Sequence, residues 1–112
     1  MDLFNDIQKL ISELNESIKI LAKYGKDLSL AEKEYKICLR QEALKLRNDD
    51  KMAVTLINQI IYGIPNVAEK RFKRDVAEAM RNTALENINV KKLQLRILLK
   101  QLELEWGNSN NE

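Results

Sequence analysis

The most constraining feature of this chain is how few of its residues can end a helix. Its 112 residues include three glycines and one proline, namely Gly25, Gly63, Pro65 and Gly107. The stretch 66–106 contains neither residue type and is rich in strong helix formers. A helix over that stretch would be roughly 60 Å long, about twice the diameter of a compact domain of this size. We therefore expect an all-α fold, an elongated helical hairpin or bundle with one long C-terminal helix, completed by oligomerisation.

These glycine and proline residues divide the chain into segments whose apolar residues recur with helical spacing. We predict a single helical domain over 1–107, a disordered polar tail over 108–112, and helices at about 3–24, 30–47, 52–62 and 67–106. Asp2 is the expected N-cap of the first helix, and Gly25 is its expected left-handed stop. Two further helix starts are predicted from the capping-box spacing, at Ser29 with Glu32 and at Asn66 with Glu69.

The first helix carries an apolar stripe with alternating spacings of three and four residues, typical of a helix seam. Its members are Phe4, Ile7, Ile11, Leu14, Ile18 and Leu21, widened by Leu3 and Leu10. The short apolar segment 52–62 is rich in β-branched residues, so strand is the competing interpretation. A lone strand would have no partner in this chain, and we therefore predict a helix.

The second helix is apolar on one side and basic on the other. The apolar side contains Ala31, Tyr35, Cys38, Leu39 and Leu46, and the opposite side contains Lys33, Lys36, Arg40 and Arg47. Ile37 and Leu44 lie among the basic residues, so we expect this face to bind another protein. Glu42 projects into the apolar side and must find a donor. We expect a structural bond to Arg71, Arg74 or Tyr35, with a functional role as the alternative.

The long C-terminal helix changes character along its length. In its first half we expect one buried stripe, made of Phe72, Val76, Ala79, Met80 and Thr83. The opposite side would be a solvated basic group made of Lys70, Lys73, Arg74 and Arg81. Asn82, Thr83, Asn87 and Asn89 are weak helix formers, so the alternative is a kink at that point.

The second half of this helix is apolar on two sides, which is the main argument for self-association. One side holds Val90, Leu93, Ile97 and Leu104. The other side holds Ile88, Leu95, Leu98, Leu99, Leu102 and Trp106. All ten are predicted to form a homo-oligomer interface. We expect Trp106 to clamp the helix end, with a binding hot spot as the alternative.

The chain offers few residues for catalysis. It has no histidine and one cysteine, Cys38, so the usual triads and zinc sites are missing. Three isolated glycines cannot form a phosphate-binding loop. We therefore predict that the protein is not an enzyme and holds no cofactor or metal. Cys38 is expected to be a small buried hydrophobe in a reducing cytoplasm, and no apolar run is long enough for a membrane span.

Two basic stripes are the only feature that favours nucleic-acid binding. They comprise Lys33, Lys36, Arg40 and Arg47 together with Lys70, Lys73, Arg74 and Arg81, and side-by-side packing could join them into one cationic surface. The alternative is that both are solvated faces with nearby carboxylate partners. The net charge of +2 is too small to decide between these interpretations.

Residues 31–106 resemble a family of small helical proteins encoded by bacteriophages and prophages of Gram-positive bacteria. The resemblance rests on the runs 31–36, 44–47, 54–57 and 69–79, on Gly63, and on 93–96 with Glu105 and Trp106. It implies a cytoplasmic phage protein of unassigned role, associated with replication and recombination genes. It assigns no catalytic or ligand-binding residue.

These observations favour a non-catalytic, oligomeric helical module that binds a host or phage protein. The alternative is an accessory protein of phage replication or recombination that binds nucleic acid without reading its sequence. A structural or chaperone-like assembly factor is a third hypothesis.

Overall fold

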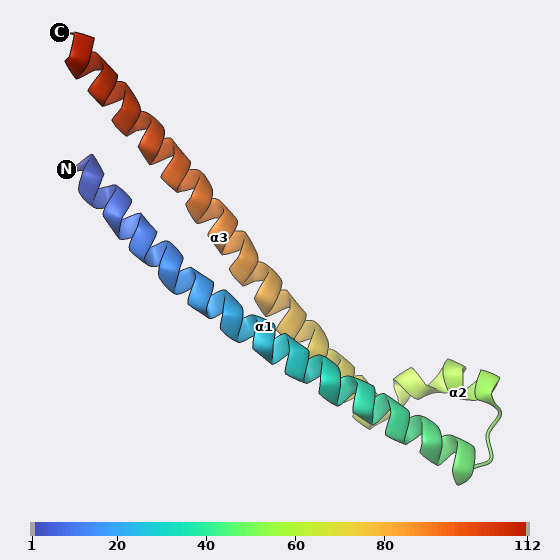
Figure 1. Cartoon of the computed structure of the whole chain (residues 1–112). Coiled ribbons are helices and arrows are strands. Elements are labelled where there is room, and N and C mark those ends of the chain that lie inside the picture. The colour runs from blue at the N-terminus through green and yellow to red at the C-terminus, as the bar shows by residue number, and fades with distance from the viewer. Residues whose placement is uncertain (1, 112) are drawn as a thin grey trace. The chain divides into compact units, whose positions relative to one another are not determined.

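The computed structural model describes residues 2–111, with side chains for residues 2–107, and is helical almost throughout. Helix α1 spans Leu3–Asn48, α2 spans Val54–Ile60, the 3-10 helix η1 spans Ile61–Gly63, and α3 spans Pro65–Asn111 (Figure 1). Within the described residues there is no strand. The prediction of an all-α fold with one long C-terminal helix is confirmed, as is the prediction of a helix rather than a strand after residue 52.

The chain divides into two compact units, and each helix of the long pair contributes to both. Unit 1 comprises Met1–Lys23 and Asn82–Glu112, and unit 2 comprises Tyr24–Arg81. In each unit an α1 segment and an α3 segment run antiparallel (Figure 1). The contacts thus divide residues that the sequence analysis treated as one helical domain, and we describe the two units separately.

Unit 1 is held together by one stripe from each helix. Its buried residues are Ile7, Leu10, Leu14 and Ser17 of α1 with Ala84 and Ile88 of α3. Three members of the predicted seam, Phe4, Ile11 and Ile18, are instead exposed. The candidate stripes 4/11/18 and 3/10/17 flank the same residues 7, 14 and 21 with equivalent spacings, so the sequence alone could not choose between them. The position of α3 selects the second stripe.

Unit 2 adds a third element and has the more deeply buried core. Tyr35, Ile57, Ile61 and Val67 form this core, drawn from α1, α2, η1 and α3. Val67 is completely inaccessible to solvent. Half-buried side chains pack around these four, namely Cys38, Leu39, Ala43, Leu46, Met52 and Ile64. The predicted placement of Cys38 on the apolar side is therefore confirmed.

Helix α1 does not stop at Gly25, and the predicted break into helices 3–24 and 30–47 is wrong. No described glycine has a positive φ, so Gly25 does not adopt the left-handed geometry of a helix stop. The Ser29 hydroxyl donates to the Gly25 carbonyl oxygen at 3.1 Å, instead of capping a new helix. A glycine costs a helix only about 1 kcal/mol relative to alanine. Packing on both sides of Gly25 offsets that cost.

The beginnings of α1 and α3 differ in how well they were predicted. The Asp2 carboxylate accepts a hydrogen bond from the Phe4 N–H at 3.0 Å, which confirms the predicted N-cap. Helix α3 begins two residues earlier than expected, at Pro65, and the Ala68 N–H donates to the Ile64 carbonyl at 2.9 Å. Proline suits a first helical position because its φ is preset and no N–H is needed there. The predicted capping box at Asn66 is therefore wrong.

Helix α3 is one uninterrupted α-helix through Asn82 and Asn89, so the alternative of a break there is not observed. The weak helix formers cost only a few tenths of a kcal/mol each, and α3 packs along this region. The predicted end at Gly107 is also wrong, because the helical backbone continues to Asn111. Gly107 lacks the left-handed φ that would stop the helix. Of the predicted tail, Glu112 and the side chains of 108–111 lie outside the described residues.

Candidate interaction surfaces

The first half of α3 packs with the face opposite to the one predicted. Phe72, Val76 and Met80 were expected to be buried, yet all are exposed, Phe72 by 64%. The half-buried positions between Val67 and Ala84 are Lys70, Arg74, Ala77 and Arg81. Short Ala77 allows close approach, and the long stems of lysine and arginine cover apolar surface while their charged ends reach polar partners. A prediction from apolar residues alone therefore selected the wrong side of α3 as the buried one.

The inward-facing cations of α3 are partnered within unit 2. The Arg74 guanidinium lies over the Tyr35 ring, 4.7 Å from its centroid, and its Nη2 lies 2.8 Å from Asp75 Oδ1. The hydrogen bond that Arg74 donates to the Asp75 carboxylate raises the pKa of Arg74, so this side chain keeps its charge. Lys70 Nζ lies 3.7 Å from Glu34 Oε2. These contacts explain how charged residues occupy a packed face.

Glu42 finds none of its three predicted partners. Its half-buried carboxylate accepts a hydrogen bond from Asn66 Nδ2 at 3.3 Å and lies 3.5 Å from Lys45 Nζ. Arg71, one predicted partner, lies over the Tyr62 ring at 5.4 Å. The early start of α3 places the Asn66 amide beside Glu42. The expectation of a structural hydrogen bond is met, but through Asn66, which sequence reasoning had assigned to a cap.

The predicted oligomer interface divides into a packed part and an exposed part. Ile88 is buried, and Leu95, Leu98 and Leu102 are half-buried on the side of α3 that faces α1. The remaining six are exposed, namely Val90, Leu93, Ile97, Leu99, Leu104 and Trp106. The predicted clamping role of Trp106 is wrong, because this side chain is 67% exposed.

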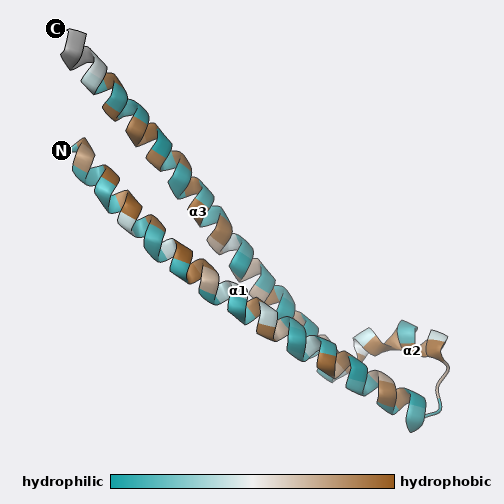
Figure 2. Ribbon diagram, in the orientation of Figure 1, coloured by the Kyte–Doolittle hydropathy of each residue, from teal (hydrophilic) through white to brown (hydrophobic). Residues whose placement is uncertain are grey.

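Four of the exposed residues form a single line, which we call the α3 outer stripe. Val90, Leu93, Ile97 and Leu104 follow spacings of three, four and seven, and each is between 46% and 57% exposed. At 100° per residue they lie opposite the packed positions 88, 95 and 102. Figure 2 shows hydrophobic and hydrophilic residues alternating along this helix. The second apolar side of α3 is thus uncovered in the single chain.

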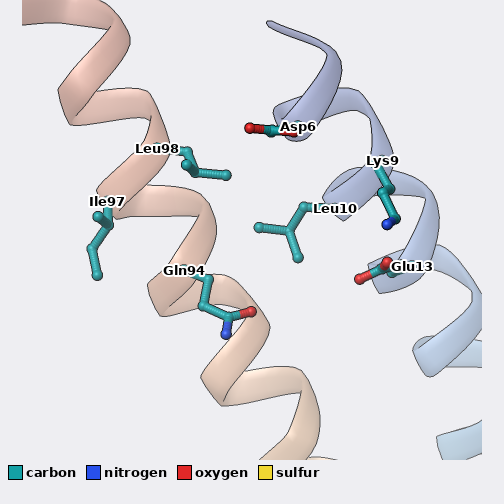
Figure 3. Close-up of a pocket in the computed structure, with 7 residues that line it drawn as sticks. All are labelled: Asp6, Lys9, Leu10, Glu13, Gln94, Ile97 and Leu98. Atoms are coloured by element: carbon teal, nitrogen blue, oxygen red, sulfur yellow. The ribbon is translucent and has the colours of Figure 1, made fainter. Parts of the chain in front are cut away.

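A groove of about 390 Å³ lies between the helices of unit 1. Figure 3 shows Leu10 and Leu98 pointing toward one another across it, whereas Ile97 lies on the other side of α3. Its remaining lining residues are Asp6, Lys9, Glu13 and Gln94. The groove has an apolar floor and a mixed rim, but it contains no pairing of a nucleophile with a base. It offers contact area rather than chemistry.

One polar contact interrupts the apolar packing of unit 1. The hydroxyl of buried Ser17 accepts a hydrogen bond from Lys91 Nζ at 2.7 Å and donates to the Glu13 carbonyl at 2.9 Å. Both side chains occupy seam positions, because they continue the three-and-four spacing of their helices. Sequence reasoning missed this pair. The signal was present, since Ser17 and Lys91 each interrupt a run of apolar seam residues.

The two predicted basic stripes do not join into one solvent-facing surface. Lys33, Lys36, Arg40 and Arg47 are exposed on α1. Of the α3 group, Lys70, Arg74 and Arg81 are half-buried on the packed side. Lys73 is exposed and lies 3.8 Å from Glu69. The cationic surface in unit 2 therefore comes from α1.

Sites for other chemistry do not emerge from the part of the chain that the structure describes. Within it, no cluster of three or more His, Cys, Asp or Glu residues could hold a metal ion. No helix among these residues has the length and apolarity to span a bilayer. Comparisons with known protein families, with curated proteins and with solved structures found no match. The resemblance to phage-encoded proteins stays a prediction.

Proposed function

We propose that this protein is a non-catalytic helical interaction module that self-associates through the α3 outer stripe and binds a second protein. The single observation that carries the proposal is the exposure of Val90, Leu93, Ile97 and Leu104 on a helix whose opposite side is already packed. Isolated apolar residues are normal on protein surfaces, but a line of them at helical spacing is typical of a contact surface. In the setting that the sequence resemblance implies, the second protein belongs to the phage or its host.

The surroundings of the stripe favour another copy of the same chain as its occupant. The exposed side chains beside the stripe include the uncharged Asn89, Gln94 and Gln101. Nearby Lys100 lies 3.7 Å from Glu103, so these two charges offset each other. Two such faces can therefore approach without strong repulsion between like charges. A two-fold dimer, in which the same patch meets itself, fits this surface.

The apolar area supports a weak dimer. Burying a Val, Leu or Ile side chain completely is worth about 1.5–3 kcal/mol, so covering the exposed half of each contributes about 1 kcal/mol. Two copies of the four-residue stripe then contribute about 8 kcal/mol, against an association cost of about 4–15 kcal/mol. The balance predicts an equilibrium between monomer and dimer that depends on concentration.

The test is light scattering over a dilution series of the full chain. We expect the mass to rise with concentration in the unmodified protein, and Leu93→Glu with Ile97→Glu to remain monomeric with unchanged helical circular dichroism. The matched control is Gln8→Glu with Asn15→Glu, which adds the same charge to exposed positions of α1 in the same unit, away from the stripe. A chain that stays monomeric at every concentration, or a variant with unchanged mass, would contradict the proposal.

The nucleic-acid alternative receives less support. Three of its four α3 cations lie on the packed face, and Arg74 and Lys70 already have carboxylate partners. What remains is a single row of cations on α1, interleaved with aliphatic side chains. Binding driven by phosphates would weaken steeply with added salt, which distinguishes it from binding through apolar contacts.

A further inference from the structure

The outer face of α1 in unit 2 has an unusual composition. Between residues 30 and 47, seven exposed positions on one side of α1, away from α3, hold aliphatic and basic residues without a single carboxylate. They are Leu30, Lys33, Lys36, Ile37, Arg40, Leu44 and Arg47. We call this set the α1 outer face. The acidic residues of the same segment, Glu32, Glu34 and Glu42, lie elsewhere around the helix.

Among the described residues, the four cations of this face have no charged partner. Among the side chains of residues 2–107, none forms an ion pair with Lys33, Lys36, Arg40 or Arg47. Three other lysines of unit 2 behave differently, since Lys45, Lys70 and Lys73 each lie within 3.8 Å of a glutamate. The α1 outer face therefore presents a row of unpaired positive charge along about four helical turns.

The aliphatic residues of the face form a second, parallel row. Leu30, Ile37 and Leu44 recur every seven residues and are 46% to 54% exposed. A repeat of seven returns to nearly the same side of a helix, so a partner helix can contact all three. Beside this row, a groove of about 460 Å³ opens between α1 and α2, with Leu39, Ala43 and Ile57 in its lining and Lys36 and Arg40 at its edge.

We infer that the α1 outer face binds an acidic amphipathic helix of a partner protein. Aliphatic residues of the partner would cover Leu30, Ile37 and Leu44, and its carboxylates would meet the four cations. The inference rests on the proposed function in assigning a protein partner to this chain. It adds the location of the partner site and the chemistry that the site recognises.

Other occupants fit the face less well. A nucleic-acid backbone would pair with the cations but would leave three exposed aliphatic side chains without apolar contact. A helix that lies on a bilayer needs a broad apolar face with its cations on the polar side, whereas here cations and aliphatics share one narrow face. A second copy of the same face would place like charges together.

The experiment measures binding of designed peptides to the full chain by calorimetry. The probe is a helical peptide with leucine every seventh position and glutamate on both flanks. The comparison peptide carries lysine in place of every glutamate. Calf-thymus DNA and phosphatidylserine vesicles are tested alongside. We expect the acidic peptide to bind and the basic peptide, the DNA and the vesicles to bind at least tenfold more weakly.

Matched variants localise the binding. Lys33→Glu with Arg40→Glu should weaken the acidic peptide by roughly tenfold or more and strengthen the basic one. The control pair, Lys9→Glu with Lys19→Glu, makes the same charge change on α1 in unit 1 and should have no effect. Ile37→Ser should weaken the acidic peptide several-fold, whereas Ile18→Ser, which alters an equally exposed isoleucine of unit 1, should not.

Several outcomes would overturn the inference. They are equal binding of both peptides, binding of neither, and tighter binding to DNA or vesicles that Ile37→Ser does not change. Light scattering of the same samples reports self-association separately, through residues of α3. A chain that dimerises but ignores the acidic peptide would therefore refute the partner site and leave the dimer standing. A chain that stays monomeric but binds the acidic peptide would refute the dimer and support the partner site.

Discussion

Units 1 and 2 show what a third element changes in a helical pair. In unit 1 each helix has one neighbour and can bury one stripe, so the second apolar side of α3 stays exposed. In unit 2, α2 and η1 add Ile57 and Ile61 to a core in which Val67 loses all contact with solvent. The difference teaches that a third element lets unit 2 enclose side chains completely, whereas the packing of unit 1 is confined to one stripe from each helix.

The two units also differ in where they place charge. Unit 1 buries one polar contact, between Ser17 and Lys91, in an otherwise apolar seam. Unit 2 lines the α3 side of its seam with Lys70, Arg74 and Arg81. Arg74 remains charged there because Tyr35 and Asp75 both stabilise the guanidinium. The stability of unit 2 therefore depends mainly on its core near α2, and the stability of unit 1 depends on the apolar seam between its two helices.

The largest expected effect tests the core of unit 2. Ile57→Ala removes a buried side chain that packs with Ile61 and Val67, and it leaves a cavity behind. We expect it to lower the free energy of unfolding by about 3 kcal/mol, measured by urea denaturation at fixed protein concentration. The matched control is Ile60→Ala, the same change at an exposed position of the same helix, for which we expect a loss below about 1 kcal/mol. Equal losses would show that α2 does not complete the core.

The next prediction concerns the polar contact of unit 1. Ser17→Ala removes the acceptor of Lys91 and leaves a half-buried ammonium without this hydrogen bond. We expect a loss of about 1 kcal/mol in the free energy of unfolding, moderated because the lysine can extend toward water.

The double variant Ser17→Ala with Lys91→Leu should recover that loss, since replacing both polar partners by apolar groups removes the desolvation cost. A double-mutant cycle with Lys91→Leu alone measures the coupling between the two residues. If the two substitutions changed the free energy of unfolding by strictly additive amounts, the hydrogen bond between Ser17 and Lys91 would contribute nothing to stability.

Much of the fold could be predicted because helix propensity and apolar periodicity are local properties. The long C-terminal helix follows from the absence of glycine and proline over 66–106, and Asp2 acts as the predicted N-cap. The helix at 54–60 was preferred over a strand because nothing in the chain could pair with a strand. Each of these conclusions depends on neighbours in sequence.

The errors concern which side of a helix meets another helix, and that is decided by a distant segment. The residues 4/11/18 and 3/10/17 were equivalent until α3 selected one set. On α3, the side with Arg74 packs inward and the apolar side with Phe72 and Val76 stays exposed. The Tyr35 ring offers a partner to the guanidinium of Arg74, which the apolar pattern could not predict. The α1 outer face was recognised in part, since Ile37 and Leu44 stood out among cations. That these cations have no ion-pair partner among the described residues depends on tertiary packing and could not be derived from the sequence.

The smallest expected effect tests the continuity of α1, on which the comparison of the units depends. Gly25→Ala places a methyl group that meets nothing within 4 Å apart from its chain neighbours and the nearby backbone of its own helix. In a helix interior this change should raise the free energy of unfolding by about 0.5–1 kcal/mol, because alanine loses less backbone entropy on folding. Ala22→Gly, one turn earlier on the same helix, should lower it by a similar amount. The sign is decisive. If Gly25 ended a first helix in the left-handed region, alanine would be strained there, and both substitutions would destabilise the protein.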